Sequence, residues 1–127
     1  PRSLDESDQL RGLIIYERGN VSVKQLRPGA KLRVGRSKDA DGCIDHPEVS
    51  RHHANFTFDG EGMVVEDLGS KNGTFVNGAR VARPVRLTDG DRIQVGRATL
   101  VCRELSLVRS TQTQRSGQAL PATSRRK

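Results

Sequence analysis

Three short runs of polar residues carry side chains that could bind an anionic group. They are Gly35-Arg36, Ser50-Arg51-His52-His53 and Gly69-Ser70-Lys71-Asn72-Gly73-Thr74. A phosphate needs several charge-assisted donors: arginine supplies a planar fork that lysine cannot reproduce, and serine supplies one compact hydroxyl. The asparagine amide can both donate to and accept from a peptide main chain. Each run alone would fit an ordinary turn, but together these residue types suit an anionic group such as a phosphate.

Two other kinds of site are disfavoured by the spacing of the residues. Cys43, His46, His52 and His53 could in principle ligate zinc, but their spacing does not match a structural zinc pattern. Ser50 lies close to two histidines, but no nucleophile elbow surrounds it. We therefore expect no metal, no cofactor and no catalytic residue, and hence no enzyme.

The segments around the polar runs have the pattern of β-strands. Short apolar runs alternate with turn signals such as Asn72-Gly73, and no stretch keeps helical periodicity over several turns. Ala54, Phe56 and Phe58 alternate with polar neighbours, as in a strand with one buried face. Strands are expected at residues 13–17, 21–26, 31–34, 54–59, 63–67, 74–76, around 85, 92–95 and 99–104. This spacing predicts an all-β sandwich or barrel with the polar runs in its loops.

Composition divides the 127 residues into one domain and two end segments. Residues 10–105 contain most of the apolar side chains and have room for a single core. Residues 1–9 are polar and acidic, and residues 106–127 have hydroxyl, amide and basic side chains with little to bury. We expect both end segments to be disordered, the second as a basic tail or linker.

Much of the formal net charge of +7 lies in that tail, which carries five basic side chains and no acid. The charge raises an alternative function, nonspecific nucleic-acid binding by the tail, with the sandwich as a scaffold that does not read phosphate. Against it, the chain has only four aromatic side chains and no stacking motif. Binding that vanished with the tail and with rising salt would identify this alternative.

Nothing in the sequence directs the chain to a membrane. No apolar run is long enough to span a bilayer, and no export signal is visible. Two cysteines are too few for a disulfide framework, so Cys43 and Cys102 are expected to be reduced thiols. We expect a cytoplasmic protein and, because arginine dominates its basic residues, a bacterial one. Because the chain begins without methionine, we expect a fragment of a longer chain.

The three polar runs, in this order and at these spacings, resemble the forkhead-associated (FHA) domain. Flanking pieces that include Val34-Gly35-Arg36, Phe75-Val76-Asn77-Gly78 and Leu87-Thr88-Asp89-Gly90-Asp91 extend the resemblance over about residues 11–105. The resemblance implies an all-β fold, a two-sheet β-sandwich whose loops at one end bind a phosphothreonine peptide.

The resemblance also implies roles for five residues of the loops. Arg36 and Ser50 align with residues that recognise the phosphate in the family. Arg51 and Lys71 align with positions from which family members add contacts to the phosphate or the peptide. Asn72 aligns with the residue that holds the peptide main chain after the phosphothreonine. These five residues form the expected phosphopeptide site.

Further residues are expected to support this site or to set its selectivity. Glu48 lies in the loop with which family members read the third residue after the phosphothreonine, and its carboxylate should disfavour acidic peptides there. His53 aligns with a histidine that supports the loop from inside. Gly35 and Gly73 suit tight turns or positive φ angles. Asn77 could contact the peptide or brace the recognition loop, and the bracing role is favoured.

The function implied by the resemblance is a phosphothreonine-dependent protein interaction module. Such a module recruits phosphorylated partners in serine/threonine kinase signalling, and a kinase or one of its substrates is the natural partner. The expected tail carries Thr111, Thr113 and Thr123, which could occupy the site after phosphorylation, in cis or in a second molecule.

Overall fold

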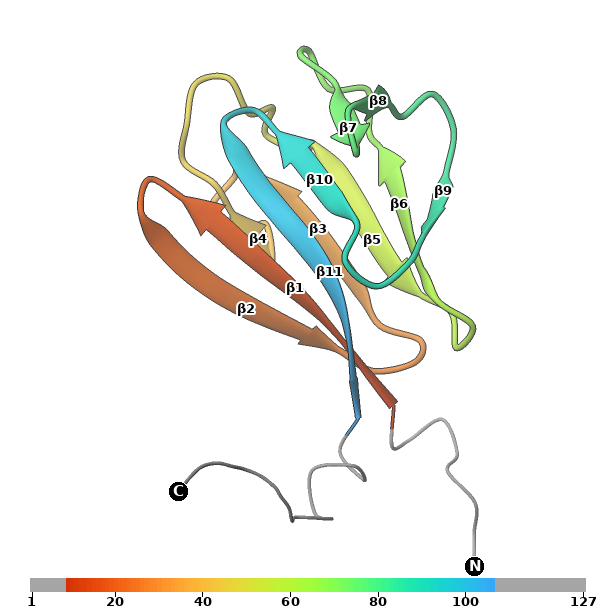
Figure 1. The fold of residues 1–127 in the computed structure, drawn as a ribbon. Coiled ribbons are helices and arrows are strands. Elements are labelled where there is room, and N and C mark those ends of the chain that lie inside the picture. The colour runs from red at the N-terminus through yellow and green to blue at the C-terminus, as the bar shows by residue number, and fades with distance from the viewer. Residues whose placement is uncertain (1–8, 107–127) are drawn as a thin grey trace, which may run out of the picture.

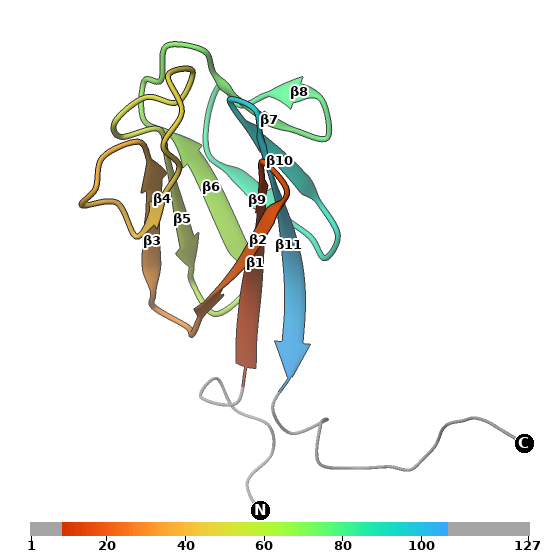
Figure 2. The ribbon, with the colours of Figure 1, turned by 90° about the vertical axis from the view of Figure 1, so that its left-hand side faces the viewer.

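The computed structural model describes residues 9–106 as two β-sheets packed face to face (Figures 1 and 2). The six-stranded sheet has the order β2 (Asn20–Leu26), β1 (Gln9–Glu17), β11 (Ala98–Ser106), β10 (Arg92–Val95), β7 (Thr74–Val76) and β8 (Ala79–Arg80). The five-stranded sheet has the order β4 (Gly42–Cys43), β3 (Lys31–Gly35), β5 (Ala54–Phe58), β6 (Met63–Asp67) and β9 (Val85–Leu87). The two-sheet sandwich predicted from the sequence is confirmed. Within residues 9–106 no helix could cross a membrane.

The core lies between the sheets, where alternate side chains of the strands meet. Ala54, Phe56 and Phe58 of β5 are fully buried, as their alternation predicts. They belong to one cluster with buried residues of the other sheet, among them Leu13 of β1 and Ile93 of β10. Burial of these side chains is the main force that holds the sheets together.

The strand predictions hold for most of the chain, with differences at strand ends and sheet edges. β1 begins at Gln9 rather than at residue 13, because residues 9–12 continue to pair with β11. The half-buried Arg11 is accommodated there with its guanidinium 4.6 Å from the centroid of the Phe58 ring. β4 and β8 were not predicted, since two residues are too few to show a period. The predicted disordered ends lie outside the described residues, except that Gln9 and Ser106 belong to strands.

The polar runs all lie at one end of the sandwich. β3 ends there, β5 begins there, and the segment between β6 and β7 crosses it (Figure 1). The first and last described residues pair with each other, Gln9 with Ser106, at the opposite end. We call these the loop end and the terminal end.

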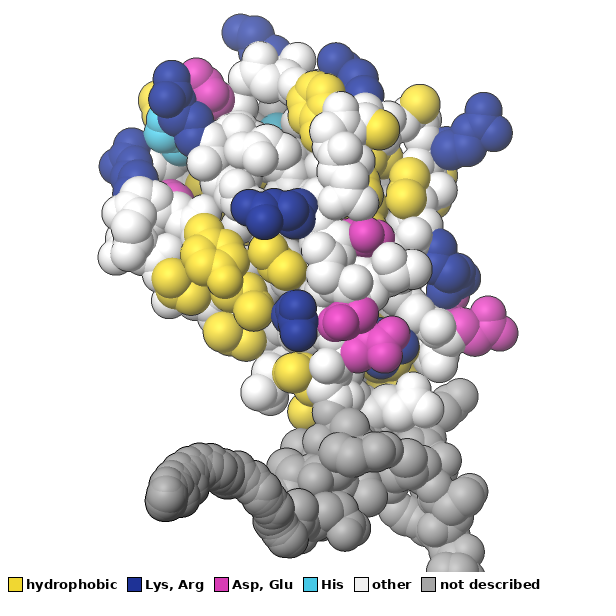
Figure 3. Space-filling model, viewed as in Figure 1, with side chains coloured by type: hydrophobic (Ala, Val, Ile, Leu, Met, Phe, Trp, Pro, Cys, Tyr) yellow, Lys and Arg dark blue, Asp and Glu magenta, His cyan; other side chains and the backbone are white. Residues whose placement is uncertain are grey.

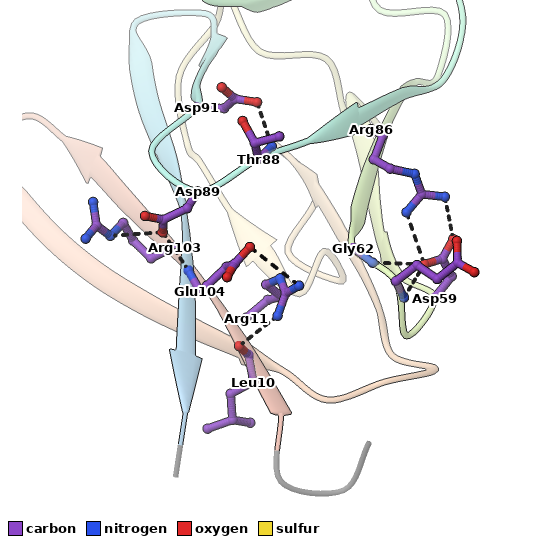
Figure 4. A network of polar contacts seen from close by, with 11 residues as sticks. Leu10, Arg11, Asp59, Gly62, Arg86, Thr88, Asp89, Asp91, Arg103 and Glu104 are labelled. Atoms are coloured by element: carbon purple, nitrogen blue, oxygen red, sulfur yellow. Dashed lines mark hydrogen bonds and ion pairs between the residues drawn. The ribbon is translucent and has the colours of Figure 1, made fainter. Parts of the chain in front are cut away.

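Side-chain hydrogen bonds and ion pairs stabilise the turns that lie near the terminal end (Figure 4). Arg86 donates two hydrogen bonds, of 3.2 and 2.8 Å, to the Asp59 carboxylate. With the backbone N–H groups of Glu61 and Gly62, this guanidinium holds the pKa of Asp59 well below its usual range. Because both side chains of the pair are exposed, water screens the attraction and its contribution to stability is small.

Candidate functional site

The segments 35–36, 50–53 and 69–74 come together because the chain continues to pair beyond its strands. The backbone N–H of Arg36 donates to the Ser50 carbonyl at 2.9 Å, and that of Leu68 donates to the His53 carbonyl at 2.9 Å. This pairing demands a glycine at position 35, since a Cβ there would lie 2.1 Å from the Arg51 carbonyl oxygen. Glycine is therefore needed at position 35 because two backbone segments approach closely there, and not because the chain turns.

Arg36 is anchored through one part of its guanidinium. Its Nε donates to the carbonyl oxygen of Val49 at 2.9 Å, which fixes the plane of the group beside the next loop. Among residues 9–106 no carboxylate forms an ion pair with Arg36, and the residue is exposed. The two terminal amino groups are thus available for an anion, in the bidentate geometry that suits phosphate.

Ser50 links the two loops on which the site stands. Its Oγ accepts a hydrogen bond of 2.9 Å from the backbone N–H of Lys71, and its own N–H donates to Nδ1 of His53 at 3.0 Å. A hydroxyl that accepts from a backbone N–H still has its own proton to donate. Ser50 therefore offers a positioned O–H donor beside Lys71.

Asn72 forms a second link between the same loops. Its Nδ2 donates to the carbonyl oxygen of Glu48 at 2.8 Å. Within residues 9–106 its Oδ1 accepts no hydrogen bond, so this oxygen and the second amide hydrogen remain for another main chain. The amide is oriented before any peptide arrives.

His53 supports these loops from the interior, and it is fully buried. Its Nδ1 accepts from the Ser50 N–H, so the proton must lie on Nε2, which donates to the Gly73 carbonyl at 2.9 Å. The ring thereby connects the loop of Ser50 to the loop of Asn72.

Asp67 organises the loop that carries Lys71 and Asn72, a role not assigned from the sequence. Its carboxylate accepts from the N–H groups of Gly69 and Ser70 and, at 2.6 and 2.7 Å, from the hydroxyls of Ser70 and Thr74. Partial burial alone would raise the pKa of Asp67, but these hydrogen bonds outweigh it and lower the pKa. An aspartate two residues before a glycine is an Asx-turn signal that could have revealed this role.

Gly73 and Asn77, the other two predicted support residues, lie in different parts of the structure. Gly73 has a φ of 92°, and the Arg80 guanidinium covers the side on which a Cβ would stand. Within residues 9–106 no side-chain hydrogen bond joins Asn77 to the loop of residues 69–73; its amide donates to Asp91 and accepts from the backbone N–H of Arg92. Asn77 therefore braces the β7–β8 turn against β10.

The loop end carries mainly positive charge. Figure 3 shows Lys and Arg side chains standing around it, and Arg51 and Lys71 are both exposed. Within residues 9–106 neither forms an ion pair, whereas Glu48 lies 3.5 Å from Arg97. No group of three or more His, Cys, Asp or Glu side chains among these residues could hold a metal ion. The arrangement suits an anionic group beside an extended main chain.

Comparison with known proteins matches residues 32–96, half of the chain, to the FHA domain. The ABC transporter ATP-binding/permease protein Rv1747 of Mycobacterium tuberculosis is 44% identical over 104 residues, which cover 73% of this chain and 12% of that protein. Glycogen accumulation regulator GarA of Mycolicibacterium smegmatis is 39% identical over 90 residues, 70% of this chain and 56% of GarA. The chain thus spans about half of GarA and a small part of Rv1747.

Solved structures show the same fold. One, from a structural and functional analysis of phosphothreonine-dependent FHA domain interactions, has a TM-score of 0.67 at 34% identity and covers 76% of this chain and 99% of that one. Mycobacterium tuberculosis EmbR in complex with a low-affinity phosphopeptide has a TM-score of 0.65 at 33% identity, over 74% of this chain and 24% of EmbR. By sequence and by fold, this chain belongs to the FHA domain family.

Proposed function

We propose that this chain binds phosphothreonine-containing proteins through the loop end of its sandwich. The observation that carries the proposal is the way in which the protein holds the Arg36 and Ser50 side chains. Each is anchored by the protein through one polar atom, Nε of Arg36 and Oγ of Ser50, and each keeps donors for a ligand. Donors that are held before binding lose little conformational entropy on binding, which favours affinity.

Asn72, Lys71 and Arg51 complete the proposed site. The Asn72 amide is poised for the main chain of the residue that follows the phosphothreonine, while the exposed cations of Lys71 and Arg51 add charge beside the phosphate. The solved relatives support this assignment, because one comes from phosphothreonine-dependent interactions and another holds a phosphopeptide.

The proposed role is recruitment rather than catalysis. A serine/threonine kinase or one of its substrates is the expected partner, because a kinase must install the phosphate, and the cytoplasm is the expected location. Self-association through a phosphorylated tail, and nucleic-acid binding by that tail, are not proposed, because the tail lies outside the described residues.

The test is calorimetric titration with a peptide selected from an oriented phosphothreonine library and with its unphosphorylated twin. The unaltered domain should bind only the phosphorylated peptide. Arg36→Ala should weaken binding about ten- to hundredfold, the equivalent of about 1.5–3 kcal/mol for a hydrogen bond to a charged group. Arg36→Lys should recover only part of the loss, since an ammonium keeps the charge but not the fork.

Arg103→Ala is the matched control, because it removes one arginine that pairs with Asp89 away from the loop end. It should bind like the unaltered domain. Equal binding of the two peptides, or undiminished binding by folded Arg36→Ala, would contradict the proposal.

A further inference from the structure

The turn between β10 and β11 packs against the loop that carries Ser50. A Cβ built on Gly96 would lie 2.7 Å from a methyl group of Val49 and 3.6 Å from Cβ of Glu48. The next residue, Arg97, reaches the Glu48 carboxylate, with 3.5 Å between Nε and Oε2. No motif in the sequence points to this turn, yet it borders the proposed site.

Glu48 stands between the groups proposed to hold the phosphopeptide. Its carbonyl accepts from Nδ2 of Asn72, and the carbonyl of the next residue, Val49, accepts from Nε of Arg36. A peptide held by Ser50 and by Asn72 at once must therefore pass next to Glu48. The Glu48 side chain and its partner Arg97 border the path of that peptide.

The two charges are not equally accessible. The Arg97 side chain is 75% exposed and the Glu48 side chain 47% exposed, so a ligand side chain meets the guanidinium more readily than the carboxylate. The other charged residues of the proposed site, Arg36, Arg51 and Lys71, are cations. Considered alone, Glu48 would repel acidic peptides, but the ion pair offsets its charge.

We propose that Arg97 is a specificity-determining residue, which neutralises Glu48 and offers its guanidinium to a carboxylate side chain of the bound phosphopeptide. The proposal rests on the phosphopeptide function proposed above and reverses the charge preference expected from Glu48 alone. Arginine can serve two carboxylates, because its five N–H donors point in different directions.

The test is a positional scan of phosphothreonine peptides that carry Asp, Ala or Lys at each position near the phosphothreonine. The unaltered domain should prefer Asp to Lys at one position. Arg97→Ala should lower the Asp-to-Lys affinity ratio there about two- to fivefold, the range for one exposed charge pair, and should leave the requirement for phosphate intact. Glu48→Ala should raise the ratio, the double variant should have a ratio between those of the two single variants, and Arg97→Lys should keep part of the Asp preference.

Arg83→Ala is the control for loss of one positive charge. Arg83 is exposed and forms no ion pair within residues 9–106, so its loss should not change the ratio. A ratio unchanged by Arg97→Ala, in a folded variant that still requires phosphate, would overturn the role of Arg97 and leave the proposed function standing. Failure of the unaltered domain to require phosphate would overturn both.

Discussion

The Oγ atom of Ser50 accepts a hydrogen bond of 2.9 Å from the backbone N–H of Lys71, twenty-one residues further along the chain. One hydroxyl thus joins two loops while it keeps a proton for a ligand. Removal of this oxygen should therefore affect binding and stability together. A side chain that only contacted ligand would affect binding alone.

Ser50→Ala should weaken phosphopeptide binding about ten- to hundredfold and lower the free energy of unfolding by about 1 kcal/mol. Stability falls because the Lys71 N–H loses its hydrogen-bond acceptor. The loss is small because this N–H is exposed and water can take the place of the acceptor. Titration calorimetry and urea unfolding would measure the two effects. Arg51→Ala provides the comparison, because the Arg51 side chain is exposed and forms no ion pair within residues 9–106. Equal stability of Ser50→Ala and the unaltered domain would argue against the loop link.

Asn72→Asp should weaken binding more than Asn72→Ala. Aspartate has no N–H to donate to the Glu48 carbonyl, and it places a negative charge near that oxygen and near the phosphate. Alanine only removes the link. The measurement is the dissociation constant of both variants at low and high salt, since the extra loss in Asn72→Asp should shrink as salt screens the charge.

His53→Ala should be among the most destabilising single changes in the loops, at about 2–4 kcal/mol. The change leaves a cavity in a fully buried position and removes the partners of the Ser50 N–H and the Gly73 carbonyl. Chemical denaturation would measure the loss. His52→Ala is the matched control, because His52 is exposed, and it should cost less than about 0.5 kcal/mol.

Asp67 should make the domain sensitive to acid. Its pKa is lowered in the folded state, so its stabilisation is complete above the ordinary aspartate value near pH 4 and is lost as pH falls through the lowered folded pKa. Asp67→Asn should cost about 1–3 kcal/mol at pH 7, because an amide cannot accept all four hydrogen bonds. The gap between variant and unaltered domain should narrow below about pH 4 in urea titrations, and a gap independent of pH would show that the charge of Asp67 is unimportant.

The two free cysteines should react at very different rates. Cys43 is exposed, whereas Cys102 is buried and burial raises the pKa of its thiol to about 11. With excess iodoacetamide, the folded domain should therefore gain one label per molecule quickly, at Cys43, and a second label only after denaturation. Peptide mass mapping would assign the label, with Cys43→Ser as the control.

Much of the fold could be predicted because burial leaves a period of two in the sequence, as in Ala54, Phe56 and Phe58. The residues of the proposed site were found through their ordered motifs. The contact of Glu48 with Arg97 could not be found, since it depends on how the loop before β5 packs against the turn between β10 and β11. Likewise, nothing in the sequence shows whether the Asn77 amide bonds to the loop of residues 69–73 or to β10.

The pairing of Gln9 with Ser106 has a practical consequence. Opposed residues of antiparallel strands lie about 5 Å apart, so the chain enters and leaves the sandwich at almost one point. Residues 9–106 can therefore be grafted into a single surface loop of another protein without forcing the two ends of that loop apart. In such a chimera the loop end would face away from the host, at the far end of the strands.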